Sequence, residues 1–136
     1  PDAISGEELD QWVREGLISY EGFHKDVRPV LADADCFVFP SYYNEGVPRC
    51  LMEAAAMGLP VITSDNRGCR DVVQHGETGF LCRINDPFDL ADKMEQAMNL
   101  SGVERSRQGR QGRELVIRKF DIRKVIQIYH DTIGED

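Results

Sequence analysis

The sequence is short of basic side chains and of long apolar runs. Its 136 residues carry 16 Lys and Arg against 24 Asp and Glu, which gives a formal net charge of −8. Because phosphate backbones are bound by basic surfaces, this balance argues against a nucleic-acid partner. No apolar stretch approaches the roughly 20 residues of a membrane-spanning helix, and the first residues show no signal-peptide pattern. These absences favour a cytoplasmic protein.

The four cysteines also lack the spacing of a metal site. They stand at positions 36, 50, 69 and 82, without a CxxC pair. Cys36 lies within the apolar run "DCFVF", where cysteine usually acts as a small buried hydrophobe. We expect reduced thiols and no bound metal. The run "DAD" (33–35) resembles a metal-binding DxD, but it lies at the amino end of this strand. It is interpreted as the connection between a helix and the strand.

Short apolar runs alternate with helical patterns along the chain. Strands are predicted at 17–21, 35–39, 60–64 and 79–83, and helices at about 5–16, 26–34, 48–57, 70–74, 87–98, 103–119 and 122–133. This alternation predicts an α/β fold with a Rossmann-like parallel sheet and helices on both faces. Four strands are few for such a sheet, and the chain opens on a helix. The pattern therefore indicates the later part of a larger fold.

The loop "PSYYNEGVP" (40–48) is the most informative segment of the chain. In open parallel sheets, ligands bind beyond the carboxyl ends of the strands, where this loop is expected. With Pro48 at the first helical position, Val47 is the expected N-cap, and valine has no side-chain oxygen to cap the helix. Three amides then stay open at the positive end of the helix dipole: Arg49, Cys50 and Leu51. This arrangement predicts a phosphate site, and a helix end that is only hydrated is the alternative.

Two glutamates, Glu45 and Glu53, stand eight positions apart around this helix start. They lie in the run "PSYYNEGVPRCLMEAAAMGLPVITSDNRGCRDVVQHGETGFL" (40–81). This run closely resembles the nucleotide-sugar-binding segment of family 4 glycosyltransferases, which are retaining enzymes of the two-domain GT-B fold. The two glutamates match the E-x7-E signature of that family, and the likeness extends from about Gly22 to Ile133.

The resemblance implies a role for each residue around the helix start. Glu45 would be the catalytic residue and accept hydrogen bonds from the donor sugar, while Glu53 would hold the ribose hydroxyls. An ionised carboxylate can accept two hydroxyl protons in strong, charge-assisted bonds. The diphosphate would lie against Gly46, Val47, Pro48 and the helix start, and the base against Gly22, Phe23 and His24. The alternatives are a plain loop carboxylate for Glu45, an exposed helix edge for Glu53 and a solvated loop for His24.

The function implied by the resemblance is that of a longer parent enzyme. The parent would transfer a sugar from a UDP-sugar to a glycan or lipid-linked acceptor in polysaccharide biosynthesis. It would need no cofactor beyond the nucleotide sugar, its substrate. Residues 1–136 would form part of its C-terminal donor-binding domain, without the N-terminal acceptor domain and without a preceding strand–helix portion that carries an Arg and a Lys. The fragment alone is expected to bind donor weakly and to turn over nothing.

Other interpretations stay open. A non-catalytic nucleotide-binding module would need the helix start but no sugar-facing Glu45, and a GT-B-like epimerase or phosphorylase would share the fold. The donor base, the sugar and the acceptor are not readable from the sequence. The basic run "ERSRQGRQGREL" (104–115) fits a solvated helix face better than peripheral association of the parent with the inner face of a membrane.

Overall fold

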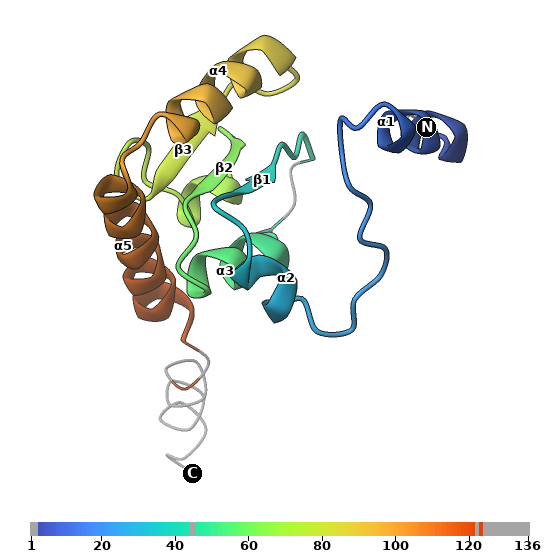
Figure 1. The fold of residues 1–136 in the computed structure, drawn as a ribbon. Coiled ribbons are helices and arrows are strands. Elements are labelled where there is room, and N and C mark those ends of the chain that lie inside the picture. Colours follow the sequence, from blue (N-terminus) through green and yellow to red (C-terminus); the bar gives the residue numbers. More distant parts are fainter. Residues whose placement is uncertain (1–2, 44–45, 122, 124–136) are drawn as a thin grey trace.

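The computed structural model describes residues 3–43, 46–121 and 123. Helices and strands follow one another along this part of the chain (Figure 1). The helices are α1 (Gly6–Arg14), α2 (Arg28–Ala32), α3 (Arg49–Ala56), α4 (Pro87–Met98) and α5 (Gly102–Phe120), with the 3-10 helix η1 (Cys69–Asp71). The strands are β1 (Phe37–Phe39), β2 (Val61–Ser64) and β3 (Gly79–Cys82).

The three strands form one parallel sheet in the order β1-β2-β3. Val61 of β2 lies opposite Phe37 of β1 and opposite Gly79 of β3. Every residue of β2 is buried, as expected for a central strand with both faces covered. The prediction of a parallel α/β sheet is therefore confirmed, and so are the strands predicted around 35–39, 60–64 and 79–83.

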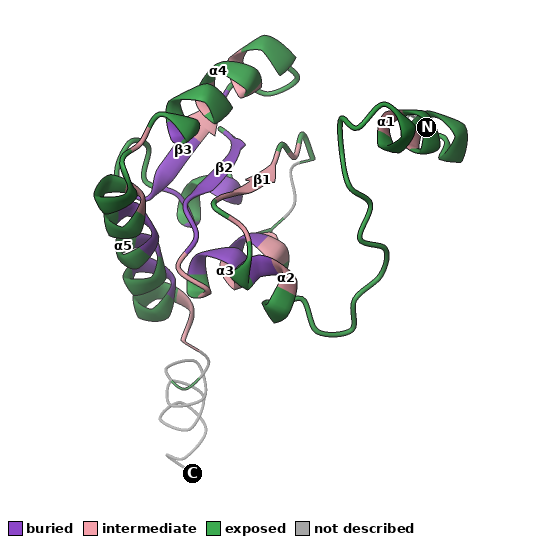
Figure 2. Cartoon of the chain, in the orientation of Figure 1, coloured by how far each residue is buried: buried purple, intermediate pink, exposed green. Residues whose placement is uncertain are grey.

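Helices cover both faces of the sheet, and alternate residues of β2 face two different cores. Val61 packs on one face with the buried side chains of α3, η1 and α5, which include Leu51, Val72 and Val116. Ile62 packs on the other face with Phe80 and with Ala97 of α4. Figure 1 shows α5 running beside β3 and α3, and Figure 2 shows that the sides of α3 and α5 that face each other are buried. This packing holds α3 in place, with its first residues beyond the carboxyl end of β1.

The strand predicted at 17–21 is wrong. Residues 18–24 follow α1 without regular structure, and no described strand pairs with them. α1 and this segment stand apart from the sheet and are exposed (Figures 1 and 2), and Leu17 and Tyr20 are each 67% exposed. Apolar residues of high β-propensity form a strand only where a neighbouring strand supplies hydrogen-bond partners, and here no described strand does so.

Helix ends differ from the sequence prediction in small ways. The capping box of Ser5 and Glu8 is confirmed, because each side chain accepts the other residue's amide. α3 begins one residue later than predicted, with Pro48 and not Val47 as its N-cap. The helix predicted at 70–74 is the 3-10 turn η1, and the helix predicted at 122–133 lies outside the described residues. Within the described ranges, no helix is long and apolar enough to cross a membrane.

Candidate functional site

The start of α3 lies beyond the carboxyl end of β1. Pro48 is the N-cap, with φ −64° and ψ 127°, and no side chain caps the helix. The amide of Leu51 donates to the carbonyl of Pro48 at 3.1 Å, so this amide is not open as predicted. The amides of Arg49 and Cys50 donate to no carbonyl of the described chain. Among the described residues, two of the three predicted donors therefore have no carbonyl partner.

The thiol of Cys50 reports on the electrostatics of this helix start. Burial raises the pKa of the Cys50 thiol, while the backbone amides of Leu51 and Cys50 act in the opposite direction by favouring the thiolate. The thiol of Cys50 therefore lies beside the amides at the start of α3, and the phosphate site there stays a prediction.

A cavity of about 230 Å³ opens between the segment after α1 and the helices α2 and α3. Its apolar lining includes Val30, Leu31 and Phe37, its polar lining includes His24 and Glu53, and Gly22 borders it as well. Cys50 also lines this cavity, so the cavity reaches the start of α3. Residues predicted to hold a base and a ribose are thus brought to one cavity although 31 positions separate Gly22 from Glu53.

Glu53 lies on the second turn of α3, where its side chain is 40% exposed. Its Oε1 accepts a hydrogen bond from Nε of Arg49 at 3.0 Å. Because the same residue lines the cavity, its carboxylate can meet a ligand bound there. The side chain is therefore partly exposed, and the alternative of an exposed helix edge stays open.

The segment before α2 contributes a turn and a fixed imidazole. Gly22 has φ +68°, a conformation that glycine adopts at little cost. Nε2 of His24 lies 2.8 Å from the carbonyl oxygen of Glu21 and donates a hydrogen bond to it, which holds the ring in place. Phe23 is 93% exposed and does not line the cavity, so the structure does not bring this predicted base contact into the site.

Glu45 lies outside the described residues, so the predicted catalytic position is not placed. Its described neighbours are Gly46, which is exposed with open space where a Cβ would lie, and Val47, which is half-buried. On the other side of Glu45, Tyr42 and Tyr43 stack with ring centroids 4.3 Å apart. The loop therefore offers an open backbone on one side and an aromatic pair on the other.

Asn66 anchors this loop, a role that sequence reasoning missed. The side chain of Asn66 is buried and donates from Nδ2 to the carbonyl of Ser41 at 3.0 Å. Its Oδ1 accepts the amide of Cys69 at 3.1 Å. The bond to Ser41 crosses between two loops. The available signal was an amide side chain two residues after a buried strand, because a buried amide needs partners.

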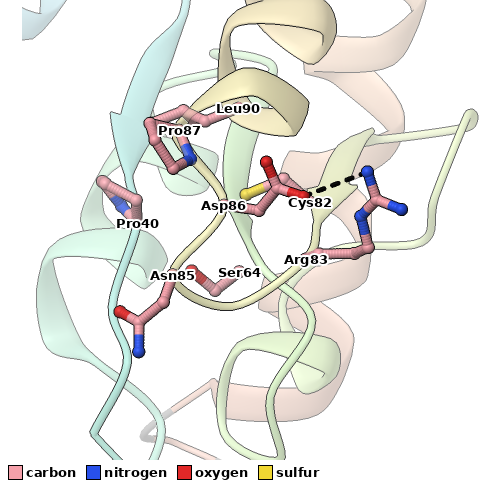
Figure 3. A pocket seen from close by; sticks show the side chains of 8 residues that line it. All are labelled: Pro40, Ser64, Cys82, Arg83, Asn85, Asp86, Pro87 and Leu90. Carbon is pink, nitrogen blue, oxygen red and sulfur yellow. Dashed lines mark ion pairs between the residues drawn. The ribbon is translucent and has the colours of Figure 1, made fainter.

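A second cavity of about 300 Å³ lies at the same edge of the sheet (Figure 3). Ser64 and Cys82, which end β2 and β3, line it together with Pro87 and Leu90 of α4. Figure 3 shows Arg83 turned toward Asp86, with their ion pair at 3.0 Å. The side chain of Asp86 accepts the amide of Asp89 and so caps α4, which leaves no open helix start here for an anion.

Comparison with known proteins identifies the family of the chain. The family described as "Glycosyl transferases group 1" matches residues 3–99. N-acetyl-alpha-D-glucosaminyl L-malate synthase of Bacillus anthracis is 31% identical over 126 residues, which cover 90% of this chain and 32% of the relative. The putative colanic acid biosynthesis glycosyltransferase WcaL of Escherichia coli is 31% identical over 120 residues, with 83% and 30% covered. The chain thus spans about a third of the length of the curated relatives it matches.

Solved structures share the fold. HepE (Alr3699) of Anabaena, solved in complex with UDP, superposes with a TM-score of 0.84 at 24% identity and covers 96% of this chain, which matches 36% of HepE. A point mutant of TarM from S. aureus, solved with UDP among its ligands, has a TM-score of 0.82 at 22% identity, with 95% of this chain and 27% of TarM covered. At these identities the likeness supports the fold class, and the ligands belong to those proteins.

Proposed function

The chain belongs to the group 1 glycosyltransferases, and we propose that it provides the donor site of a retaining enzyme that uses a UDP-sugar. The parent enzyme would transfer the sugar to a glycan or lipid-linked acceptor in polysaccharide biosynthesis. The name of the WcaL relative, a colanic acid biosynthesis glycosyltransferase, supports this class of product. The UDP complex of HepE supports the choice of nucleotide.

The observation that carries the proposal is the cavity that joins Gly22 and His24 to Glu53 and reaches the start of α3. A nucleoside diphosphate has three parts that match these surfaces. The base would lie in the partly apolar cavity, and the ribose hydroxyls would donate to the carboxylate of Glu53. The diphosphate would accept from the open amides of Arg49 and Cys50. Arg49 and Glu53 are four residues apart, or about 6 Å along the helix, which suits the step from a ribose to its phosphates.

Transfer of the sugar would need further groups besides those of the cavity and the start of α3. Glu45, in the loop beside the diphosphate site, would hold the donor sugar through its hydroxyls. Negative charge develops on the diphosphate as the glycosidic bond breaks, and its stabilisation is a large part of such catalysis. We assign part of that task to basic groups of a preceding segment, and acceptor binding to an N-terminal domain. The relatives are about three times the length of this chain, which leaves room for both.

The arginine-rich part of α5 supports a structural role better than a membrane-binding one. Arg105 pairs with Asp35 at 3.1 Å, and Nη1 of Arg113 donates to the carbonyl of Ala56 at 3.1 Å. Two of the four arginines in this run therefore hold α5 to the rest of the fold. We keep a cytoplasmic location and peripheral membrane association of the parent as predictions that need their own tests.

Calorimetric titration with UDP tests the proposed site. Glu53→Gln keeps the size of the side chain but removes its charge and one acceptor oxygen. Loss of a charge-assisted hydrogen bond of about 1.5–3 kcal/mol should lower affinity roughly tenfold to a hundredfold. Glu95→Gln, on the exposed side of α4, is the matched control and should bind as the unmodified chain does. Unchanged UDP binding by the Glu53 variant would refute the ribose assignment.

Glu45→Gln separates the two glutamates. Since UDP carries no sugar on its β-phosphate, this variant should keep UDP affinity and lose transfer activity in the full-length parent. A loss of UDP affinity as large as that of Glu53→Gln would contradict the assignment of Glu45 to the sugar. Failure of the unmodified chain to bind UDP at millimolar concentration would refute the donor-site proposal itself.

A further inference from the structure

Arg49 occupies a position where helix electrostatics disfavour a cation. It is the first residue of α3, at the positive end of the helix dipole, and α3 has no acidic residue in its first turn. The order of its pair with Glu53, cation before anion, is also the less favourable one within a helix. An exposed pair of this kind adds little to folding stability. The contribution of Arg49 to folding stability therefore does not account for an arginine at this position, whereas binding of an anionic ligand would account for it.

The guanidinium group of Arg49 lies between the two parts of the proposed site. Its Nε donates to Oε1 of Glu53 at 3.0 Å, and the side chain of Arg49 is 88% exposed. Its terminal N–H groups donate to no residue of the described chain. Each carboxylate oxygen has two lone pairs, so Glu53 can still accept ribose hydroxyls while Arg49 is bound to it. The guanidinium therefore has donors to spare close to the open amides of α3.

We propose that Arg49 bridges the ribose and diphosphate subsites of the donor site. Its Nε would hold the carboxylate of Glu53 in position for the ribose, and its terminal N–H groups would donate to the diphosphate. Arginine can do both because its planar fork presents five donors in fixed directions, whereas a lysine is a single point charge. This inference rests on the proposed function and adds a coupling between its two subsites.

Affinities for uridine and UDP separate the two parts of this role. Uridine has the ribose and no phosphate, so Arg49→Gln should lower its affinity only roughly threefold, through a less well-held Glu53. The same variant should lower UDP affinity roughly thirtyfold or more, because a charge-assisted contact to phosphate is also lost. Arg49→Lys should recover part of the UDP affinity through its charge but not the uridine affinity. Arg110→Gln, on the exposed side of α5, is the matched control.

The double variant Arg49→Gln, Glu53→Gln completes a thermodynamic cycle. For uridine, it should bind no more weakly than Glu53→Gln alone, because Arg49 reaches the ribose only through Glu53. For UDP, it should bind more weakly than either single variant. Circular dichroism melting should be the same for all variants, since the pair is exposed.

The outcomes distinguish this inference from the proposed function. If Arg49→Gln lowers uridine and UDP affinity by the same factor, Arg49 only positions Glu53 and the bridge is refuted. If Arg49→Gln changes neither affinity, the pair is a solvent-exposed ion pair and the bridge is again refuted, while the donor site stands. If the unmodified chain binds neither ligand, the proposed function fails and the bridge fails with it.

Discussion

Gly109 lets α5 approach the turn that closes α3, and Gly109→Ala tests this contact. A Cβ at position 109 would lie 1.8 Å from the carbonyl oxygen of Gly58 and 2.8 Å from its carbonyl carbon. Gly58 itself has φ +78°, so the turn that carries this oxygen has a backbone that few other residues adopt. Both groups belong to the backbone and cannot rotate away. α5 would have to move back by roughly 1.5 Å before the contact became ordinary.

Two opposing effects set the change in the free energy of unfolding that Gly109→Ala should cause. Alanine favours a helix over glycine by about 1 kcal/mol, which would stabilise α5. Overpacking typically costs about 1–3 kcal/mol, and here the upper end applies because α5 would separate from the core that Val116 packs against. We expect Gly109→Ala to lower the free energy of unfolding by about 2 kcal/mol. At Gly112 a Cβ would lie 3.6 Å from Cβ of Thr78, which is an ordinary contact. Gly112→Ala should therefore raise the free energy of unfolding by up to about 1 kcal/mol.

The pair of variants is measured by thermal and urea unfolding, followed by far-UV circular dichroism. A difference of about 3 kcal/mol corresponds to roughly 10 °C or more in Tm for a chain of this size. Gly112→Ala controls for helix propensity, because both substitutions lie on the buried side of the same helix. If Gly109→Ala melts at or above the temperature of Gly112→Ala, the close approach of α5 to Gly58 is not a packing constraint.

Two further substitutions test the loop anchor and an acid-sensitive carboxylate. Asn66→Ala leaves the carbonyl of Ser41 and the amide of Cys69 without their partner, so it should cost about 1–3 kcal/mol and speed hydrogen exchange of the Cys69 amide. Unchanged exchange would show that Asn66 is not the anchor. The amide of Arg83 is the main group that lowers the pKa of Asp89. Stability from Asp89 should therefore be present above about pH 4 and fall as pH drops through its lowered pKa. Asp89→Asn should therefore make the urea midpoint depend less on pH below about pH 4, and an unchanged dependence there would contradict this.

The strands that the sequence predicted correctly are those whose side chains pack against a core on both faces of the sheet. "CFVF", "VIT" and "FLC" are continuous apolar runs, and a run of this kind between helical patterns indicates a covered parallel strand. The segment "LISYE" also contains residues of high β-propensity but is not a strand. Local sequence reports the propensity of a segment to form a strand, whereas pairing depends on which other segments are present. This difference explains why one of the four strand predictions failed.

The candidate site was also predicted only in part from the sequence. The sequence predicted that Gly22, His24, Cys50 and Glu53 belong to one site, and the structure places all four around one cavity. The apolar wall formed by α2 and β1 was not predicted, because no local motif states which elements will pack beside a loop. The one-residue error at the start of α3 has a different cause. Proline fits both the N-cap and the first helical position, and only the backbone angles of Pro48 distinguish them.

The stability of α3 comes from its buried side and not from its start. α1, α4 and α5 each have a side-chain cap, while α3 lacks one and begins with a cation. A missing cap typically costs about 1 kcal/mol, which the burial of Leu51, Ala54 and Ala55 against the sheet and α5 can offset. Because packing behind the helix holds it in place, its first amides need not be used for folding. The contact between α5 and Gly58 thus helps to hold α3 from its buried side, so that the helix does not depend on a side-chain cap at its start.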